Sequence, residues 1–154
     1  MNKDNWRLAV EGIGILAIVV SLILVAVELQ QNSNIAQADS YREIVQDIAQ
    51  WRSELNADPG LLELFQSYTR GGLDDMDAKD QLRIIFAENN FFGSLESAYY
   101  SREYGIMSER EWRRFEYSAC NHYEYAVRNE RVLTLITQEF NDFLKNTCMR
   151  SGNN

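Results

Sequence analysis

Basic residues are scarce in this chain, and so are proline, histidine and cysteine. Lys and Arg number 15 against 23 Asp and Glu, a formal net charge of −8, which excludes nucleic acid as an expected partner because binding to phosphates depends on clustered basic side chains. The basic cluster Arg110, Arg113 and Arg114 is interleaved with glutamates, so we interpret it as a solvated helix face. With one proline and a composition that is 45% hydrophobic, the chain is predicted to be folded and rich in helix.

The residues that build common catalytic and metal centres are also few. The chain has one histidine, His122, and two cysteines, Cys120 and Cys148, which form no CxxC motif, so one copy cannot assemble a zinc site of the usual Cys and His type. A glycine-rich phosphate loop and a GxSxG elbow are missing as well. We therefore expect no cofactor, and we interpret the cysteines as free, mostly buried thiols, which favour a reducing compartment.

Near the start of the chain, 16 consecutive uncharged residues stand between Glu11 and Glu28. As a helix this run rises about 24 Å, against a hydrocarbon thickness of ~30 Å, and the adjoining apolar residues extend it to the ~20 residues that a span needs. Residues 1–29 are predicted to form one uncleaved membrane-spanning helix, with the lipid bilayer as its partner.

Three other interpretations of this run are weaker. A cleaved signal peptide would need small residues after the apolar core, where the chain has Val27 and Glu28. A buried helix of a soluble domain would have to be covered on nearly all sides. A helix lying flat on the membrane would need a strongly charged face, which this run does not have.

One face of the predicted span differs from the rest in composition. At ~100° per residue, about one third of the circumference holds Glu11, Gly14, Ala17, Ser21 and Glu28. Small residues let membrane helices approach closely, and a serine can hydrogen-bond across the contact. We expect this face to mediate self-association or binding to another membrane protein. The alternative is a chance composition in which the two acids only mark the membrane interfaces.

Helical periodicity continues through the rest of the chain without strand-like alternation. Residues 30–57 are predicted to be a juxtamembrane amphipathic helix continuous with the span, although a capping box at Ser40 and Glu43 would allow a restart. Start and stop signals place further helices at 59–70, from the acidic turn 74–80 to about residue 104, from 109 onward, and within 132–149. The fold class is therefore all-α: a transmembrane helix joined to a four- to five-helix bundle of residues 58–154, completed by residues 40–57.

A second candidate site is formed by polar residues among apolar ones. Asn89 and Glu96 lie on an apolar stripe of the helix predicted to end near residue 104, and buried polar groups need partners. With His122, they could bind a small cationic ligand or move a proton. The structural interpretation, which we favour, is that Glu96 pairs with an arginine such as Arg113 or Arg114 between helices.

The junction VSLILVAVELQQN resembles the start of a family of uncharacterised bacterial proteins whose single N-terminal span ends in a VSLxYLAxQxRQN-like pattern. The matching positions are Val20, Ser21, Leu22, Ala26, Gln31 and Asn32, followed downstream by FFGSLESAYY, Gly105 and Trp112. The resemblance implies a single-pass protein of the bacterial inner membrane with a helical domain of unknown function. It implies no activity or cofactor, and this chain has Gln30 where the family pattern tends to have arginine.

The orientation of the span is indicated by opposing signals. Lys3 and Arg7 precede the span, and Arg42 is the one basic residue in the twenty that follow it. By the positive-inside rule, this excess of basic residues before the span weakly favours an exported helical domain. The family resemblance and the free thiols favour a cytoplasmic domain, and this is the orientation we expect.

The function expected from these patterns is that of a non-catalytic interaction or scaffold subunit anchored by one span. A membrane-tethered ligand-sensing bundle is the alternative. An enzyme acting on a lipid or small molecule would require Glu96, His122 or Cys120 to converge within hydrogen-bond reach.

Overall fold

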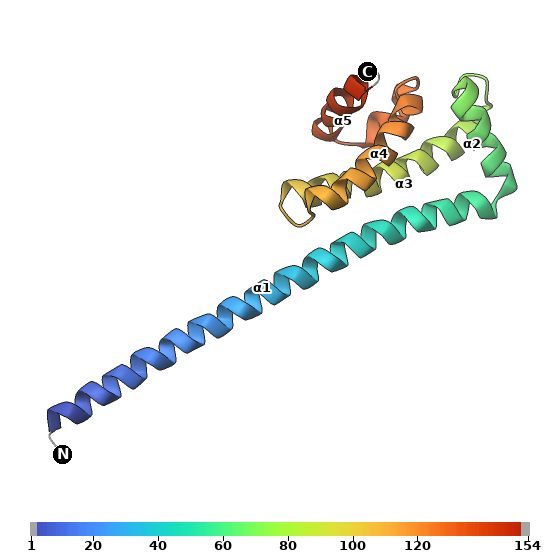
Figure 1. Ribbon diagram of the computed structural model, residues 1–154. Coiled ribbons are helices and arrows are strands. Elements are labelled where there is room, and N and C mark those ends of the chain that lie inside the picture. Colours follow the sequence, from blue (N-terminus) through green and yellow to red (C-terminus); the bar gives the residue numbers. More distant parts are fainter. Residues whose placement is uncertain (1–2, 152–154) are drawn as a thin grey trace. The chain divides into compact units, whose positions relative to one another are not determined.

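The computed structural model describes residues 3–151, and the side chains of residues 3–11, 130 and 149–151 lie outside the description. The elements in chain order are α1 (Lys3–Ala57), α2 (Pro59–Gly71), α3 (Ala78–Glu103), α4 (Glu109–Ala126), the 3-10 helix η1 (Glu130–Leu135) and α5 (Gln138–Ser151) (Figure 1). No strand occurs between residues 3 and 151. The predicted all-α class, with a long apolar helix at the N-terminus, is confirmed.

Helix α1 runs without interruption from the apolar run into the amphipathic segment that follows it. No new helix begins at Ser40, because α1 continues through it. The Ser40 hydroxyl oxygen lies instead 3.2 Å from that of Ser101 on α3. The chain divides into two compact units, Met1–Ala38 and Asp39–Asn154. We call the second unit the helical domain.

The predicted start and stop signals are found at the ends of α2 and α3. Asp58 caps α2, because its Oδ1 accepts the N–H of Leu61 at 3.1 Å, and Pro59 occupies the first helical position. Gly72 follows α2 with φ at 87°, and Gly105 follows α3 with φ at 70°. A Cβ atom disfavours this left-handed region, so glycine ends each helix at low cost.

The core of the helical domain is largely aromatic. Its side chains come from every element of the domain, including the last turns of α1. The buried apolar residues larger than alanine are Ile44, Ile48, Trp51, Tyr68, Leu73, Ile84, Phe91, Phe92, Leu95, Tyr99, Met107, Trp112, Phe115, Tyr123, Val132, Phe140 and Leu144. The Nε1–H of Trp51 donates to the carbonyl of Ala87 at 2.7 Å, which ties α1 to α3.

Cys120 on α4 and Cys148 on α5 form a disulfide across a separation of 28 residues. The interpretation of these cysteines as free thiols is therefore wrong. One turn along α4, the hydroxyl of Tyr123 donates to Oδ1 of Asn141 at 3.0 Å, so α4 and α5 are joined by both a covalent and a polar contact. Because disulfides persist in oxidising compartments, the argument from free thiols for a reducing compartment no longer holds.

Helix α4 begins with the predicted capping box. The Glu111 carboxylate accepts the backbone N–H of Ser108 at 2.9 Å, and the Ser108 hydroxyl accepts the N–H of Glu111. The hydrogen bond from the Ser108 side chain is the main cause that holds the pKa of Glu111 below its ordinary value of 4.5, and the bond from the Ser108 backbone adds to it. Since the folded-state pKa is depressed, this stabilisation is present above pH 4.5 and is lost as the pH falls through the folded value.

We expect Ser108→Ala to lower the free energy of unfolding by about 1 kcal/mol at neutral pH, because the cap is lost. The difference from wild type should shrink as the pH falls below 4.5. Urea unfolding of the full chain in mild detergent, followed by circular dichroism, measures both effects. Ser67→Ala is the control, since that hydroxyl donates only to the Glu63 carbonyl of its own helix at 3.1 Å. A difference that is the same at every pH would contradict the role of Glu111.

Candidate functional site

Among the residues whose side chains are described, the one buried charged side chain is Glu88 on α3, which is 0% exposed. Its Oε1 lies 3.4 Å from Nδ1 of His122 on α4, whose side chain is 19% exposed. Neither Oε2 of Glu88 nor the hydroxyl of Tyr68 on α2 has a hydrogen-bond partner within the described part of the chain. Burial raises the pKa of Tyr68, and the negative charge of Glu88 raises it further. Three helices therefore meet at a polar group that water does not reach.

Aromatic rings surround His122 on the side away from solvent. Its ring centroid lies 4.1 Å from that of Phe91, 5.4 Å from that of Trp51 and 5.8 Å from that of Phe65. A carboxylate removed from water needs a donor or an opposite charge, and His122 is the group placed to supply it. The arrangement therefore favours a structural pair that fixes how α3 packs against α4.

The predicted residues Asn89, Glu96 and His122 share no hydrogen bond. Oε1 of Glu96 accepts the backbone N–H of Thr137 at 2.8 Å and also the Thr137 hydroxyl, so Glu96 holds the start of α5. Its expected pairing with an arginine of α4 is wrong. The side-chain amide of Asn89 is buried without a partner among the described residues.

The sequence patterns missed Glu88 by one position along α3. The predicted stripe contained Asn89 and Glu96, whereas the buried face contains Ile84, Glu88 and Phe91. The signal was present, because Glu88 follows Ile84 by four residues and precedes Phe91 by three. Apolar residues cover two adjacent stripes of α3, and periodicity alone does not decide which of them faces the core.

We expect His122→Ala to lower the free energy of unfolding by about 3 kcal/mol, because the Glu88 carboxylate would remain buried without its partner. A double-mutant cycle separates this effect from lost ring packing. In a Glu88→Gln background the cost of His122→Ala should be clearly smaller, as measured by urea unfolding. Equal costs in both backgrounds would mean that His122 contributes only by packing.

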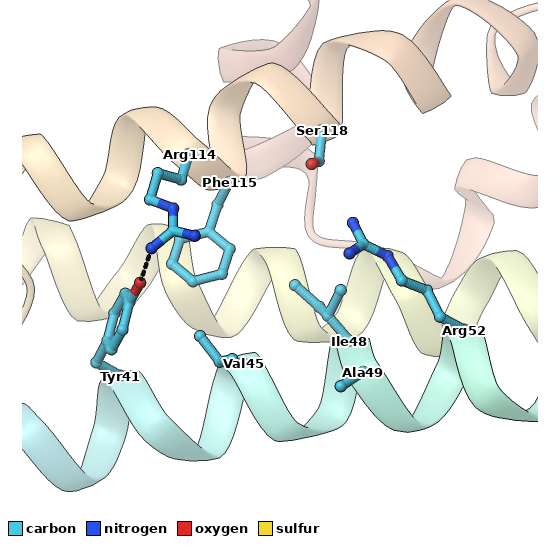
Figure 2. A pocket seen from close by; sticks show the side chains of 8 residues that line it. All are labelled: Tyr41, Val45, Ile48, Ala49, Arg52, Arg114, Phe115 and Ser118. Carbon is cyan, nitrogen blue, oxygen red and sulfur yellow. Dashed lines mark hydrogen bonds between the residues drawn. The ribbon is translucent and has the colours of Figure 1, made fainter.

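A groove with a volume of about 210 Å³ lies within the helical domain, between α1 and α4 (Figure 2). Nη1 of Arg114 donates to the hydroxyl of Tyr41 at 2.8 Å at one end of the groove. Figure 2 shows the guanidinium of Arg52 at the other end, directed from α1 toward Ser118 on α4. The lining residues are Tyr41, Val45, Ile48, Ala49, Arg52, Arg114, Phe115 and Ser118.

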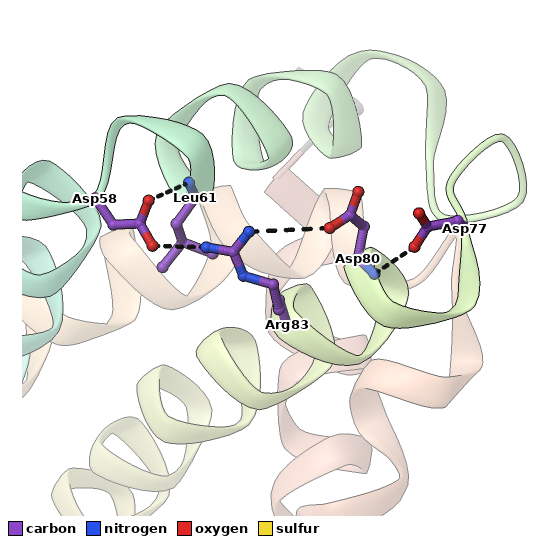
Figure 3. Close-up of polar contacts among 5 residues, drawn as sticks. All are labelled: Asp58, Leu61, Asp77, Asp80 and Arg83. Carbon is purple, nitrogen blue, oxygen red and sulfur yellow. Dashed lines mark hydrogen bonds and ion pairs between the residues drawn. The ribbon is translucent and has the colours of Figure 1, made fainter.

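Arg52 and Arg114 have no carboxylate partner among the described side chains, unlike Arg83 on α3. Nη2 of Arg83 lies 2.6 Å from Oδ2 of Asp58, and its Nη1 lies 3.9 Å from Oδ1 of Asp80 (Figure 3). The carboxylates that cap α2 and begin α3 thus neutralise Arg83. The two groove arginines keep their charge available. Arg114 is exposed, as the interpretation of a solvated helix face predicts, and it also bonds to Tyr41 on α1.

In the first unit, a hollow with a volume of about 280 Å³ lies on α1, lined by Ala17, Ile18, Ser21, Leu22 and Val25. The Ser21 hydroxyl donates to the carbonyl of Ala17 at 2.9 Å. Among the other residues of the predicted face, Gly14 and Glu28 are exposed, and the side chain of Glu11 lies outside those described.

Comparison of the chain with protein-family models, with curated proteins and with solved structures found no match. Within the described residues, no group of three or more His, Cys, Asp or Glu side chains could hold a metal ion. The groove, the buried pair and the apolar run are therefore interpreted from their own geometry and chemistry.

Proposed function

We propose that this protein is a single-pass protein of the bacterial inner membrane and acts as an interaction or scaffold subunit. The observation that carries the proposal is the exposure of the apolar run. One helix, α1, is long and apolar enough to cross a membrane, and none of its apolar window is buried. Leu16 is 67% exposed and Ile23 is 57% exposed. Apolar surface costs ~25 cal/mol per Å² when it stays in water, and a bilayer removes that cost along the whole run.

Self-association is supported by the shape of one face of the run. The hollow at Ala17 and Ser21 is flanked by larger side chains, which is the surface relief that lets a second helix approach closely. Gly14 belongs to the same face, and its lack of a side chain lets a partner helix come close there as well. Because the lipid tails are as apolar as the helix, such close packing is what drives membrane helices together.

We expect Gly14→Leu and Ser21→Leu to weaken self-association about tenfold, because a larger side chain would hold the helices apart. Analytical ultracentrifugation in mild detergent and crosslinking in membranes measure the effect. Gly12→Leu is the matched control: it makes the same change toward the opposite side of the helix, and an added Cβ there also meets nothing within 4 Å. Ile15→Leu is a second control, and equal effects from all these variants would refute a specific face.

We further infer that the helical domain lies on the oxidising side of the membrane. The Cys120–Cys148 disulfide supports this orientation, and so does the order of Lys3 and Arg7 before the span with Arg42 after it. The cytoplasmic orientation expected from the sequence now rests on the family resemblance alone.

A reporter fused after Asn154 tests the orientation. We expect alkaline phosphatase at this position to be active and a fluorescent protein that folds only in the cytoplasm to be dark. In the same cells, Cys148→Ser should leave Cys120 open to a membrane-impermeant maleimide, whereas the wild-type chain should react only after reduction. The reverse reporter pattern would place the domain in the cytoplasm.

The two other functions receive unequal support. The enzyme hypothesis needed Glu96, His122 and Cys120 to act together, but these residues are paired with Thr137, Glu88 and Cys148, respectively. Ligand sensing keeps support from the groove between α1 and α4, which lies away from the polar residues that first suggested it.

A further inference from the structure

We propose that the groove between α1 and α4 binds an oxyanion, a carboxylate or a phosphate, carried on a small apolar body. The groove lies entirely within the helical domain. The proposal is therefore independent of association through the span, and the two can fail separately.

The charge of the groove favours an anion. The chain as a whole carries a formal charge of −8, yet none of the residues that line this groove is acidic and two of them are arginines. Arg52 comes from α1 and Arg114 from α4, so two guanidinium groups reach the same space from different helices (Figure 2). The planar fork of a guanidinium matches the two oxygens of a carboxylate or phosphate.

One of the two arginines is already held in place. The bond from Nη1 of Arg114 to the Tyr41 hydroxyl leaves the remaining N–H groups of that guanidinium to donate elsewhere. The Tyr41 ring in turn packs edge-on against Phe115, with 5.8 Å between centroids. A ligand that bonds to Arg114 therefore loses less side-chain freedom than one that must order a free arginine.

The middle of the groove is apolar. Phe115, Val45 and Ile48 lie between the two guanidinium groups in Figure 2. Phe115 and Ile48 are buried, which gives the groove a fixed wall. A volume of about 210 Å³ equals roughly seven water molecules at ~30 Å³ each, which is room for one ring or a short chain beside the anionic group. An inorganic ion alone would leave the apolar wall of the groove in contact with water.

Two sources could supply such a ligand: a soluble organic acid or phosphate ester, and the headgroup region of an anionic lipid. They share the chemistry that the groove recognises. The experiment therefore needs one arm for each source.

In the first arm, the full chain in phosphatidylcholine nanodiscs is titrated with phenyl phosphate by calorimetry, with inorganic phosphate and benzyl alcohol as partial probes. We expect phenyl phosphate to bind more tightly than either. Arg52→Gln and Arg114→Gln should each weaken binding about tenfold or more. Arg113→Gln should change it less than about twofold, since Arg113 carries the same charge on the same helix but does not line the groove.

Filling the groove gives a test that leaves the charge unchanged. Ala49 lines the groove and is exposed, so Ala49→Phe should block phenyl phosphate while the helical domain keeps its thermal unfolding midpoint.

In the second arm, the thermal unfolding midpoint in nanodiscs containing phosphatidylglycerol is compared with that in phosphatidylcholine alone. If phosphatidylglycerol raises the midpoint of the wild-type chain but not that of Arg52→Gln, the lipid is the source of the ligand.

Binding in the first arm only identifies a soluble ligand, and a response in either arm supports the oxyanion groove. The proposal is overturned if neither arm responds. It is also overturned if Arg113→Gln weakens binding as much as Arg52→Gln, since that result would mean nonspecific attraction to positive charge. Equal binding of benzyl alcohol and phenyl phosphate would remove the role of the anion.

Discussion

The packing of Trp51 among four helices is the interaction on which the rest of the helical domain depends. Its indole N–H donates to the Ala87 carbonyl on α3, and its ring contacts Phe65 of α2, Phe91 of α3 and His122 of α4. Trp51 itself belongs to α1, the helix that also carries the apolar run. One continuous helix thus supplies both the apolar segment suited to a bilayer and the side chain against which α2, α3 and α4 pack.

The same aromatic cluster lies against the buried carboxylate of Glu88 and its partner His122. The aromatic rings that meet Trp51 also cover one side of His122, which lies against the buried Glu88 carboxylate. A packing of α3 on α4 that kept the Glu88 carboxylate buried but moved His122 away would leave that carboxylate without a partner, which is costly in a low-dielectric interior. Apolar packing alone tolerates many arrangements of similar volume, so we infer that the pair selects one of them.

The outer surfaces of the protein have opposite characters. The apolar run offers small residues and a shallow hollow at Ala17 and Ser21, suited to another helix. The groove of the domain offers two arginines that pair with no carboxylate among the described side chains of this acidic protein, which suits an anion. In the functions proposed here, the first surface joins the protein to an assembly and the second binds a ligand.

The amino-acid sequence by itself determined what depends on near neighbours: the apolar run, the ends of α2 and α3, and the capping box of α4. Helical periodicity and capping involve residues within about four positions of each other, so they can be read along the chain. The tertiary structure decided three pairings: Cys120 with Cys148, Glu88 with His122 and Tyr41 with Arg114, at separations of 28, 34 and 73 residues. Which stripe of α3 faces the core, and which side chains α4 meets on α1 and α5, follow from how whole helices pack, and no local pattern encodes that choice.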